Sequence, residues 1–225
     1  MCKFSFQRFT VHQERCAMKV GTDGTLLGAW AGGGRRVLDI GTGTGLIALM
    51  MAQRFEDAVV DAIDIDGDSC EQARENVAAS PFSDRIHVLH SRVQDYTPVS
   101  GYDAIVSNPP FFVQSLKAPD ERRTTARHTD ELSYRDLMHH AARLLNPDGE
   151  FSVVIPFDCR AGLETEAIMA GLFPSRVCAV RTTSRKPPRR YLLAFRKKAV
   201  TVSTTELLMG SDEYRELVKD FYLKI

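Results

Sequence analysis

The chain has 225 residues, 44% of them hydrophobic, and its 29 basic residues balance 29 acidic ones to give a formal net charge of zero. This size and composition suit one medium-sized domain with a full core, and the zero net charge excludes a global basic field as the means of attracting a nucleic acid. The five cysteines form no metal-ligand spacing or closed disulfide set, so we expect no metal. No apolar run approaches the roughly 20 residues that cross a bilayer, so we expect no membrane segment. We expect a cytoplasmic protein, and a monomer.

Apolar runs alternate with helical patterns from residue 37 onward. The predicted strands are Val37–Ile40, Ala58–Ile65, Arg85–His90, Ala104–Ser107, Glu150–Ile155, Ser175–Thr182 and Arg190–Arg196. The predicted helices are Ile47–Phe55, Ser69–Ala79, Tyr134–Leu145, Gly162–Ala170 and a segment within Asp212–Leu223. The alternation predicts an α/β fold with a parallel sheet. The last two strands must be antiparallel, because their connection through Ser184–Pro188 is too short for a crossover.

A turn is expected at Asn146–Gly149, directly before its strand. No linker or repeat divides the chain, so we expect one domain over residues 1–225. Within it we expect a cap region at 1–34, an α/β core at 35–200 and a docking segment at 201–225.

A glycine-rich turn, Asp39-Ile40-Gly41-Thr42-Gly43-Thr44-Gly45, leads from the first strand into a helix. Glycines in this position let a ligand approach the backbone closely. A dinucleotide site would carry its third glycine at position 46, where this chain has Leu46, so the pattern favours a nucleoside without a pyrophosphate. The same glycines also fit a tight strand-to-helix turn in any α/β protein.

Two acidic residues lie at the end of the second strand. Asp64 comes about 20 residues after the glycines, where a carboxylate can accept both hydroxyl groups of a ribose. Asp66 is the close alternative. Either residue also fits an ordinary role in a turn or as a helix cap before Ser69.

The segment Asn108-Pro109-Pro110-Phe111 leaves the C-terminal end of a buried strand, where open α/β sheets place their ligands. An exocyclic amino group such as adenine N6 is a poor nucleophile, because its lone pair is delocalised into the ring. If the Asn108 side-chain oxygen and the Pro109 carbonyl accept its two N–H bonds, the lone pair can turn toward a methyl group held in line. Phe111 would stack on the base. The alternative interpretation is a rigid loop with an Asn turn and an apolar plug.

Together these residues resemble the class I S-adenosylmethionine-dependent methyltransferases, which have a seven-stranded, mostly parallel sheet, a C-terminal antiparallel hairpin and helices on both faces. Three further segments resemble the bacterial family that methylates N6 of adenosine 37 in tRNA1(Val). They are Met18-Lys19-Val20-Gly21-Thr22-Asp23-Gly24, Ala126-Arg127-His128 and Asp220-Phe221-Tyr222-Leu223. The resemblance covers nearly the whole chain, and it implies S-adenosyl-L-methionine as the cofactor and tRNA as the substrate.

The resemblance also implies the members of the site. The cofactor residues would be Asp39, Gly41, Thr42, Gly43, Gly45, Asp64, Ile65, Val93 and Asn108, with Lys19, Thr22 and Asp23 near the cofactor and target pocket. The catalytic residues would be Asn108, Pro109, Pro110 and Phe111. One departure follows the third strand, where such enzymes often carry an acid that reaches the adenine amino group of the cofactor, but this chain has His90-Ser91-Arg92-Val93-Gln94-Asp95. Backbone groups near Arg92 and Val93, or the later Asp95, would have to serve.

Two local basic clusters fit the binding of RNA phosphates by a chain of zero net charge. The first cluster is Arg122, Arg123, Arg127 and His128. The second cluster is Arg185, Lys186, Arg189 and Arg190, at the terminal hairpin. The hairpin cluster also fits a solvated turn between strands.

Other functions stay open from the residues alone. The Asn-Pro-Pro segment suits a protein glutamine amide or a DNA adenine by the same hydrogen-bonding logic, and only the resemblance favours tRNA. A catalytically silent RNA-binding subunit would need a broken site, whereas Asp39, Asp64 and Asn108 are all present. A nucleotide-binding oxidoreductase is opposed by the missing third glycine.

Overall fold

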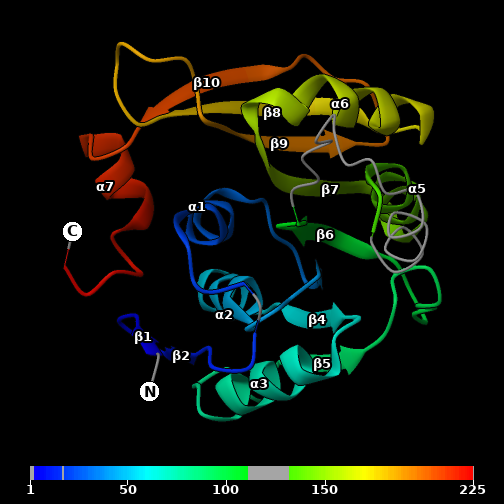
Figure 1. Ribbon diagram of the computed structural model, residues 1–225. Helices are drawn as coiled ribbons and strands as arrows, with labels where there is room; N and C mark the ends of the chain where they lie inside the picture. The colour runs from blue at the N-terminus through cyan, green and yellow to red at the C-terminus, as the bar shows by residue number, and fades with distance from the viewer. Residues whose placement is uncertain (1–2, 17, 111–131, 225) are drawn as a thin grey trace, which may run out of the picture.

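The computed structural model describes residues 3–16, 18–110 and 132–224. Within them an eight-stranded sheet has the order β10-β8-β9-β7-β6-β3-β4-β5, and a separate hairpin pairs β1 with β2 (Figure 1). The strands are β1 (Lys3–Ser5), β2 (Thr10–His12), β3 (Arg36–Ile40), β4 (Val59–Asp64), β5 (Ile86–His90), β6 (Tyr102–Ser107), β7 (Leu145–Pro156), β8 (Phe173–Arg181), β9 (Arg190–Arg196) and β10 (Ser203–Leu208). The helices are α1 (Thr22–Trp30), α2 (Leu46–Arg54), α3 (Gly67–Ala78), α5 (Tyr134–Leu144), α6 (Arg160–Met169) and α7 (Asp212–Val218), with a 3-10 turn at Phe157–Cys159. No helix in the described part of the chain is both long and apolar enough to span a membrane.

Helices cover both faces of the sheet, because neighbouring residues along a strand point to opposite sides. In β3, Val37 belongs to the core cluster that includes residues of α1, α2 and α7, whereas Leu38 belongs to the cluster that includes residues of α5 and α6. In β7, Val154 and Val153 are divided in the same way. Figure 1 shows α1 and α2 on one side of the strands and α5 and α6 on the other. Since both faces are buried, these strands carry apolar residues on both sides rather than in strict alternation.

The predicted α/β fold with a mostly parallel sheet and a terminal antiparallel hairpin is confirmed. The strands β3 to β7 pair in parallel, and β9 is antiparallel to both β7 and β8. The sheet has one strand more than the seven expected, because β10 pairs in parallel with β8 at the edge. Nearly all of β10 is exposed, so it carries no apolar pattern that would predict a strand.

The turn expected at Asn146–Gly149 lies inside β7, so the prediction of a strand starting only at Glu150 is wrong at that boundary. The pairing between β6 and β7 shifts register across these residues, which form an irregularity in the ladder. Gly149 permits the close approach, because an added Cβ would lie 2.9 Å from the carbonyl oxygens of Tyr102 and Asp103.

Helix α1 lies in the cap region, where no helix is predicted from the sequence. Its glycines lower helix propensity, and most of its residues are buried, which removes the one-sided apolar pattern of a surface helix. Packing requires Gly28, because an added Cβ would lie 2.7 Å from the sulfur of Met50 in α2. The two helices therefore pack closely, and α1 is held beside the glycine turn that precedes α2.

The two ends of the described chain meet beside α7 (Figure 1). Phe6 forms a β-bridge with Tyr222, and their rings are stacked with centroids 5.9 Å apart. The Gln7 side-chain amide donates to the carbonyl of Lys219 at 2.6 Å and to that of Tyr222 at 2.7 Å. These contacts fasten the N-terminal segment to the C-terminal one.

The strand order reverses at β3, since β4 and β5 lie on one side of it and β6 and β7 on the other. Ligands in open α/β sheets bind at such a switch point, beyond the carboxyl ends of the strands. Ile40 and Ser107 pair at the last register position of β3 and β6. The residues that follow them, Gly41 and Asn108, therefore leave the sheet side by side.

Candidate active site

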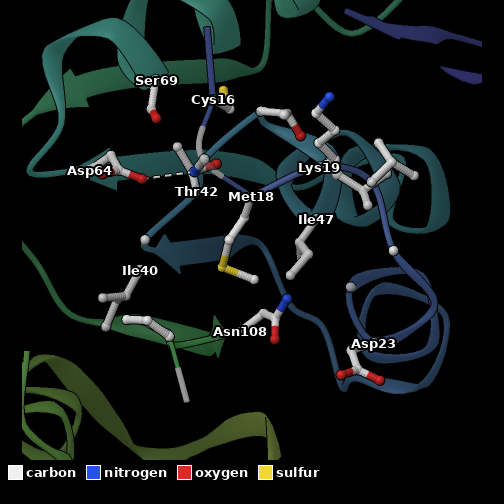
Figure 2. Close-up of a pocket in the computed structure, with 18 of the residues that line it drawn as sticks. Cys16, Met18, Lys19, Asp23, Ile40, Thr42, Ile47, Asp64, Ser69 and Asn108 are labelled. Atoms are coloured by element: carbon white, nitrogen blue, oxygen red, sulfur yellow. Dashed lines mark hydrogen bonds between the residues drawn. The ribbon is translucent and has the colours of Figure 1, made fainter. Parts of the chain in front are cut away.

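A cavity of about 720 Å³ lies beyond the carboxyl ends of β3, β4 and β6 (Figure 2). Its walls come from the segment before α1, the glycine turn after β3, the acidic end of β4, the connection after β5, and Asn108 after β6. Residues at the adjoining ends of β8 and β9 also line it, as do Leu132 and Met209. The size and the place are those of a small-molecule site at a topological switch point.

The glycine turn presents its backbone to the cavity. Gly41 and Gly43 line it in left-handed conformations, with φ angles of 73° and 53°, which residues with a side chain rarely adopt. An added Cβ at either position would meet nothing within 4 Å, so open space lies over the turn. Thr42 lines the cavity between them, whereas Gly45 caps α2 and faces Ala73 of α3.

Asp39 lies beneath the turn, fully buried, and does not line the cavity. Its Oδ2 accepts hydrogen bonds from the Thr42 hydroxyl at 2.7 Å and from the Ala48 N–H at 3.2 Å, which fixes the turn to the start of α2. Its Oδ1 is buried with no hydrogen-bond partner among the described residues. Burial away from water raises the pKa of Asp39 from 3.8 to about 7.

The buried Asp39 carboxyl makes stability depend on pH. The unfolded chain releases this proton near 3.8 and the folded protein at about 7, so the folded state binds more protons between these values. Relative to Asp39→Asn, the free energy of unfolding of the wild type should fall by at most about 4 kcal/mol as pH rises from about 4 through about 7. Denaturant titrations at pH 5 and pH 8 measure this, with Asp68→Asn at an exposed position as control. The same difference at both pH values would contradict the prediction.

The two acidic candidates after β4 have different roles. Asp64 lines the cavity, and its Oδ2 accepts the Gly43 N–H at 2.8 Å while its Oδ1 accepts the Asp66 N–H at 3.0 Å. Each carboxylate oxygen can accept a second bond, so Asp64 retains capacity for hydroxyl groups of a ligand. Asp66 also lines the cavity, but it caps α3, because its Oδ2 accepts from both the N–H and the hydroxyl of Ser69, and these bonds lower its pKa.

An apolar part of the wall lies at the ends of β4 and β5. Ile65 lines the cavity with 46% of its surface exposed, and Val93 lines it while almost fully buried. Ser91, Arg92 and Gln94 line the same region. Asp95, one of the two candidates for contacting the base of the cofactor, does not line the cavity. The backbone near Arg92 and Val93 is the candidate that does.

Asn108 brings an amide into the cavity. Its side-chain oxygen is buried and has no hydrogen-bond partner among the described residues, although buried polar atoms are nearly always paired. Gly24 of α1 packs beside the amide, since an added Cβ would lie 3.8 Å from Nδ2. Pro110 lines the cavity and Pro109 is buried next to it. Phe111 lies outside the described residues.

The segment before α1 forms a wall that the motifs only partly predict. Lys19 and Thr22 line the cavity. Asp23, beside them, forms an ion pair with Arg190 of β9 at 2.7 Å, and about three-quarters of each side chain is buried. Met18 points into the cavity with 46% of its surface exposed (Figure 2). No sequence signal assigns Met18 to a site except its place next to the Lys-Val-Gly-Thr-Asp block.

The basic residues are only partly placed. Arg122, Arg123, Arg127 and His128 lie outside the described residues. Arg185 and Lys186 are exposed on the connection between β8 and β9 and do not line the cavity, whereas Arg189 and Arg190 do. The hairpin cluster therefore borders the cavity.

The chain is similar to proteins of known family along nearly its whole length. The family model of the methyltransferase small domain matches residues 25–184. A protein of Parabacteroides distasonis named tRNA1(Val) (adenine(37)-N6)-methyltransferase is 48% identical over 99% of this chain and 98% of the relative. Proteins of the same name from Phocaeicola vulgatus and Trichodesmium erythraeum are 50% and 45% identical over the same shares.

Solved structures of low sequence identity share the fold. A predicted O-methyltransferase from Agrobacterium tumefaciens superposes with a TM-score of 0.70 at 18% identity, over 88% of this chain and 96% of that one. A methyltransferase from Pyrococcus furiosus has a TM-score of 0.57 at 21% identity, over 77% and 80% of the two chains. At these identities the likeness concerns the fold alone.

Proposed function

Because the chain belongs to the family of tRNA1(Val) (adenine(37)-N6)-methyltransferases, we propose that it transfers a methyl group from S-adenosyl-L-methionine to the exocyclic N6 of adenosine 37 in tRNA1(Val). The observation that carries the proposal is the buried side-chain oxygen of Asn108, which has no hydrogen-bond partner in the part of the chain that the structure describes and lies in the same cavity as Gly41 and Gly43. A buried acceptor without a partner needs a donor. An exocyclic amino group supplies one.

The cavity residues fit S-adenosyl-L-methionine. Gly41 and Gly43 leave open space in which a ligand can lie against the backbone. Asp64 is fixed by the Gly43 N–H and keeps acceptor capacity for the two hydroxyl groups of a ribose. Ile65 offers an exposed apolar surface for a flat base, and Val93 an inner one. When bound there, the cofactor supplies an electrophilic methyl group.

Asn108 prepares the acceptor nitrogen in this proposal. Its Oδ1 accepts one N–H of the adenine amino group and the Pro109 carbonyl accepts the other, so the nitrogen lone pair is directed out of the ring. The two prolines restrict φ and hold these acceptors still. No strong general base is needed before attack, because the nitrogen becomes acidic only as it acquires positive charge. Phe111 would stack on the flipped base.

The hairpin cluster would bind phosphates of the tRNA next to the cavity, together with the cluster at Arg122, Arg123, Arg127 and His128. Replacing Arg185 and Lys186 together by alanine should weaken tRNA binding about tenfold or more and reduce the slope of log affinity against log salt by about two. Filter binding over a range of salt concentrations measures both. Cofactor affinity should not change, because neither side chain lines the cavity.

Lys198→Ala is the matched control for this change. Lys198 is an exposed cation that pairs with Asp148 at 2.7 Å, at the opposite end of the sheet from the cavity. An unchanged salt slope in the Arg185 and Lys186 variant would mean that the tRNA binds elsewhere.

The activity is tested by incubating the protein with labelled S-adenosyl-L-methionine and total unmodified tRNA, followed by digestion to nucleosides. N6-methyladenosine confined to tRNA1(Val) is expected. Label in a protein glutamine or in DNA adenine would favour those substrates instead. If the protein binds the cofactor but labels neither tRNA, protein nor DNA, the result would favour a silent RNA-binding subunit.

We also propose that residues 1–225 act as one domain. The Phe6–Tyr222 bridge joins the cap region 1–34 to the docking segment 201–225, and the Asp23–Arg190 ion pair joins the cap region to the core 35–200. A tRNA substrate would place the activity in the cytoplasm.

A further inference from the structure

The connection between β5 and β6 carries part of the cavity wall, namely Ser91, Arg92, Val93 and Gln94. It runs from residue 91 to residue 101 without a helix or a strand. Such connections are more mobile than the elements that they join, yet a wall that binds a ligand tightly must be held in place beforehand. The Ser91 N–H donates to the carbonyl of Asp64 at 2.9 Å, and two further sets of contacts reach the connection from outside the cavity.

Arg143 of α5 holds the main chain of the connection. Its Nη2 donates to the carbonyl of Val93 at 3.1 Å and to the carbonyl of Tyr96 at 3.0 Å. Its Nε donates to Nδ1 of His140, one helical turn earlier, at 3.2 Å. Burial and the neighbouring Arg143 lower the pKa of His140, which favours the neutral ring that can accept this bond. The guanidinium is therefore oriented toward the two carbonyls.

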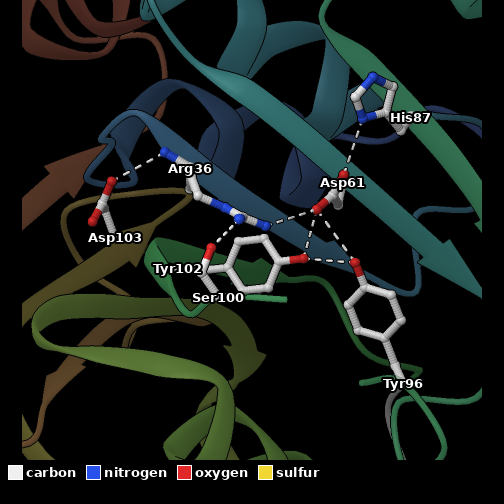
Figure 3. Close-up of polar contacts among 7 residues, drawn as sticks. All are labelled: Arg36, Asp61, His87, Tyr96, Ser100, Tyr102 and Asp103. Carbon is white, nitrogen blue, oxygen red and sulfur yellow. Dashed lines mark hydrogen bonds and ion pairs between the residues drawn. The ribbon is translucent and has the colours of Figure 1, made fainter. Parts of the chain in front are cut away.

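Tyr96 fastens the same connection through its side chain (Figure 3). Its hydroxyl lies 2.6 Å from the Tyr102 hydroxyl and 3.3 Å from Oδ2 of Asp61. Tyr102 donates to the same carboxylate at 2.6 Å, and Arg36 reaches it at 3.4 Å. Because Asp61 and Tyr102 belong to β4 and β6, the connection is tied to the sheet itself. Arg143 adds the tie to α5.

We propose that Arg143 is a positioning residue for the cofactor: by holding the Val93 and Tyr96 carbonyls, it fixes the wall that binds the base of S-adenosyl-L-methionine. This inference rests on the proposed function and extends it to a residue outside the cavity. Position 92 holds an arginine instead of an acid that could contact the adenine amino group of the cofactor, and Asp95 does not line the cavity. Recognition of the base therefore falls to the other groups of the connection that line the cavity, at residues 91–94. Their position is set by whatever holds the main chain.

A purely structural role for Arg143 would have a different signature. Arg143 is exposed, so water can replace the guanidinium at the two carbonyls, and its loss should cost little stability. A displaced wall acts on ligand affinity directly, since small errors in position are costly in a binding site.

Calorimetric titration with S-adenosylhomocysteine tests the proposal without any methyl transfer. Arg143→Ala should bind this ligand about five- to tenfold more weakly than the wild type. Its KM for S-adenosylmethionine should rise, while kcat at saturating cofactor and the ligand-free melting temperature stay unchanged. Arg143→Lys, which keeps one donor group within reach, should recover part of the affinity. Arg135→Ala removes another exposed arginine of α5 and should bind as the wild type does.

Tyr96→Phe provides a second test, because it removes only the hydroxyl that reaches Tyr102 and Asp61. It should also weaken binding of S-adenosylhomocysteine. Wild-type affinity in Arg143→Ala would overturn the inference. It would also be overturned if the melting temperature of Arg143→Ala fell far enough to explain the lost affinity and Arg143→Lys showed the same fall. If the wild type itself binds no S-adenosylhomocysteine, the proposed function fails instead.

Discussion

Replacing Asn108 by alanine is expected to lower kcat for methyl transfer to tRNA by about 10²–10³-fold, the loss typical when one preorganised hydrogen-bonding group is removed from an active site. The Asn108 oxygen is buried and finds no partner within residues 3–16, 18–110 and 132–224, and in the proposed reaction it binds the amino group that attacks. Cofactor affinity should stay close to that of the wild type, because Asp64 and the glycine turn are untouched. Single-turnover transfer from labelled cofactor measures the rate, and calorimetry measures the affinity.

Asn146→Ala is the matched control for this prediction. Its Nδ2 donates to Oδ1 of Asp103 at 2.9 Å, near the start of β7 and far from the cavity. It should transfer methyl groups at the wild-type rate. A wild-type rate in Asn108→Ala would show that another group prepares the acceptor nitrogen, and a loss of cofactor binding would show that Asn108 acts on the cofactor instead.

Replacing Asp64 by alanine is expected to weaken cofactor binding about 100-fold, corresponding to about 3 kcal/mol for two hydrogen bonds to a charged group. The carboxylate stands at the end of β4, where it accepts the Gly43 N–H and would accept both ribose hydroxyl groups. Its loss removes the ligand contact and one anchor of the glycine turn together. Titration with S-adenosylhomocysteine gives the affinity directly.

Asp66→Ala separates the two acidic residues after β4. Asp66 caps α3 through Ser69, so its loss should lower stability by about 1 kcal/mol and change cofactor affinity far less than Asp64→Ala does. The reverse order of affinities would assign the ribose to Asp66. Melting temperatures of both variants, measured without ligand, distinguish a weakened fold from a weakened site.

The core of the sheet and the glycine turn could be predicted from the sequence for a physical reason. Strands buried on both faces are mostly apolar runs, as at Val37–Ile40 and Ala104–Ser107, and a turn that needs left-handed backbone conformations carries glycines. Because β3 and β6 are neighbours in such a sheet, the placement of Asn108 next to the turn follows from the fold.

Other parts could not be predicted because their structure depends on partners distant in the sequence. Helix α1 carries Gly28, which its packing against Met50 requires, and Gly24, which faces Leu46 and Asn108, and these glycines mask its helical pattern. β10 is an exposed edge strand that forms by pairing with β8. The Asp23–Arg190 ion pair joins positions 167 residues apart, and no local motif connects them.

The joining of the N-terminal and C-terminal segments has a consequence for folding kinetics. Gln7 donates to the carbonyl of Tyr222, 215 residues later, and this contact fastens the segment that leads to Met18 and Lys19 in the cavity wall. Contacts of such long range form late in folding. During refolding from denaturant, the glycine turn and Asp64 should therefore assemble with the sheet before this wall of the cavity does, so affinity for the cofactor should be among the last native properties to recover.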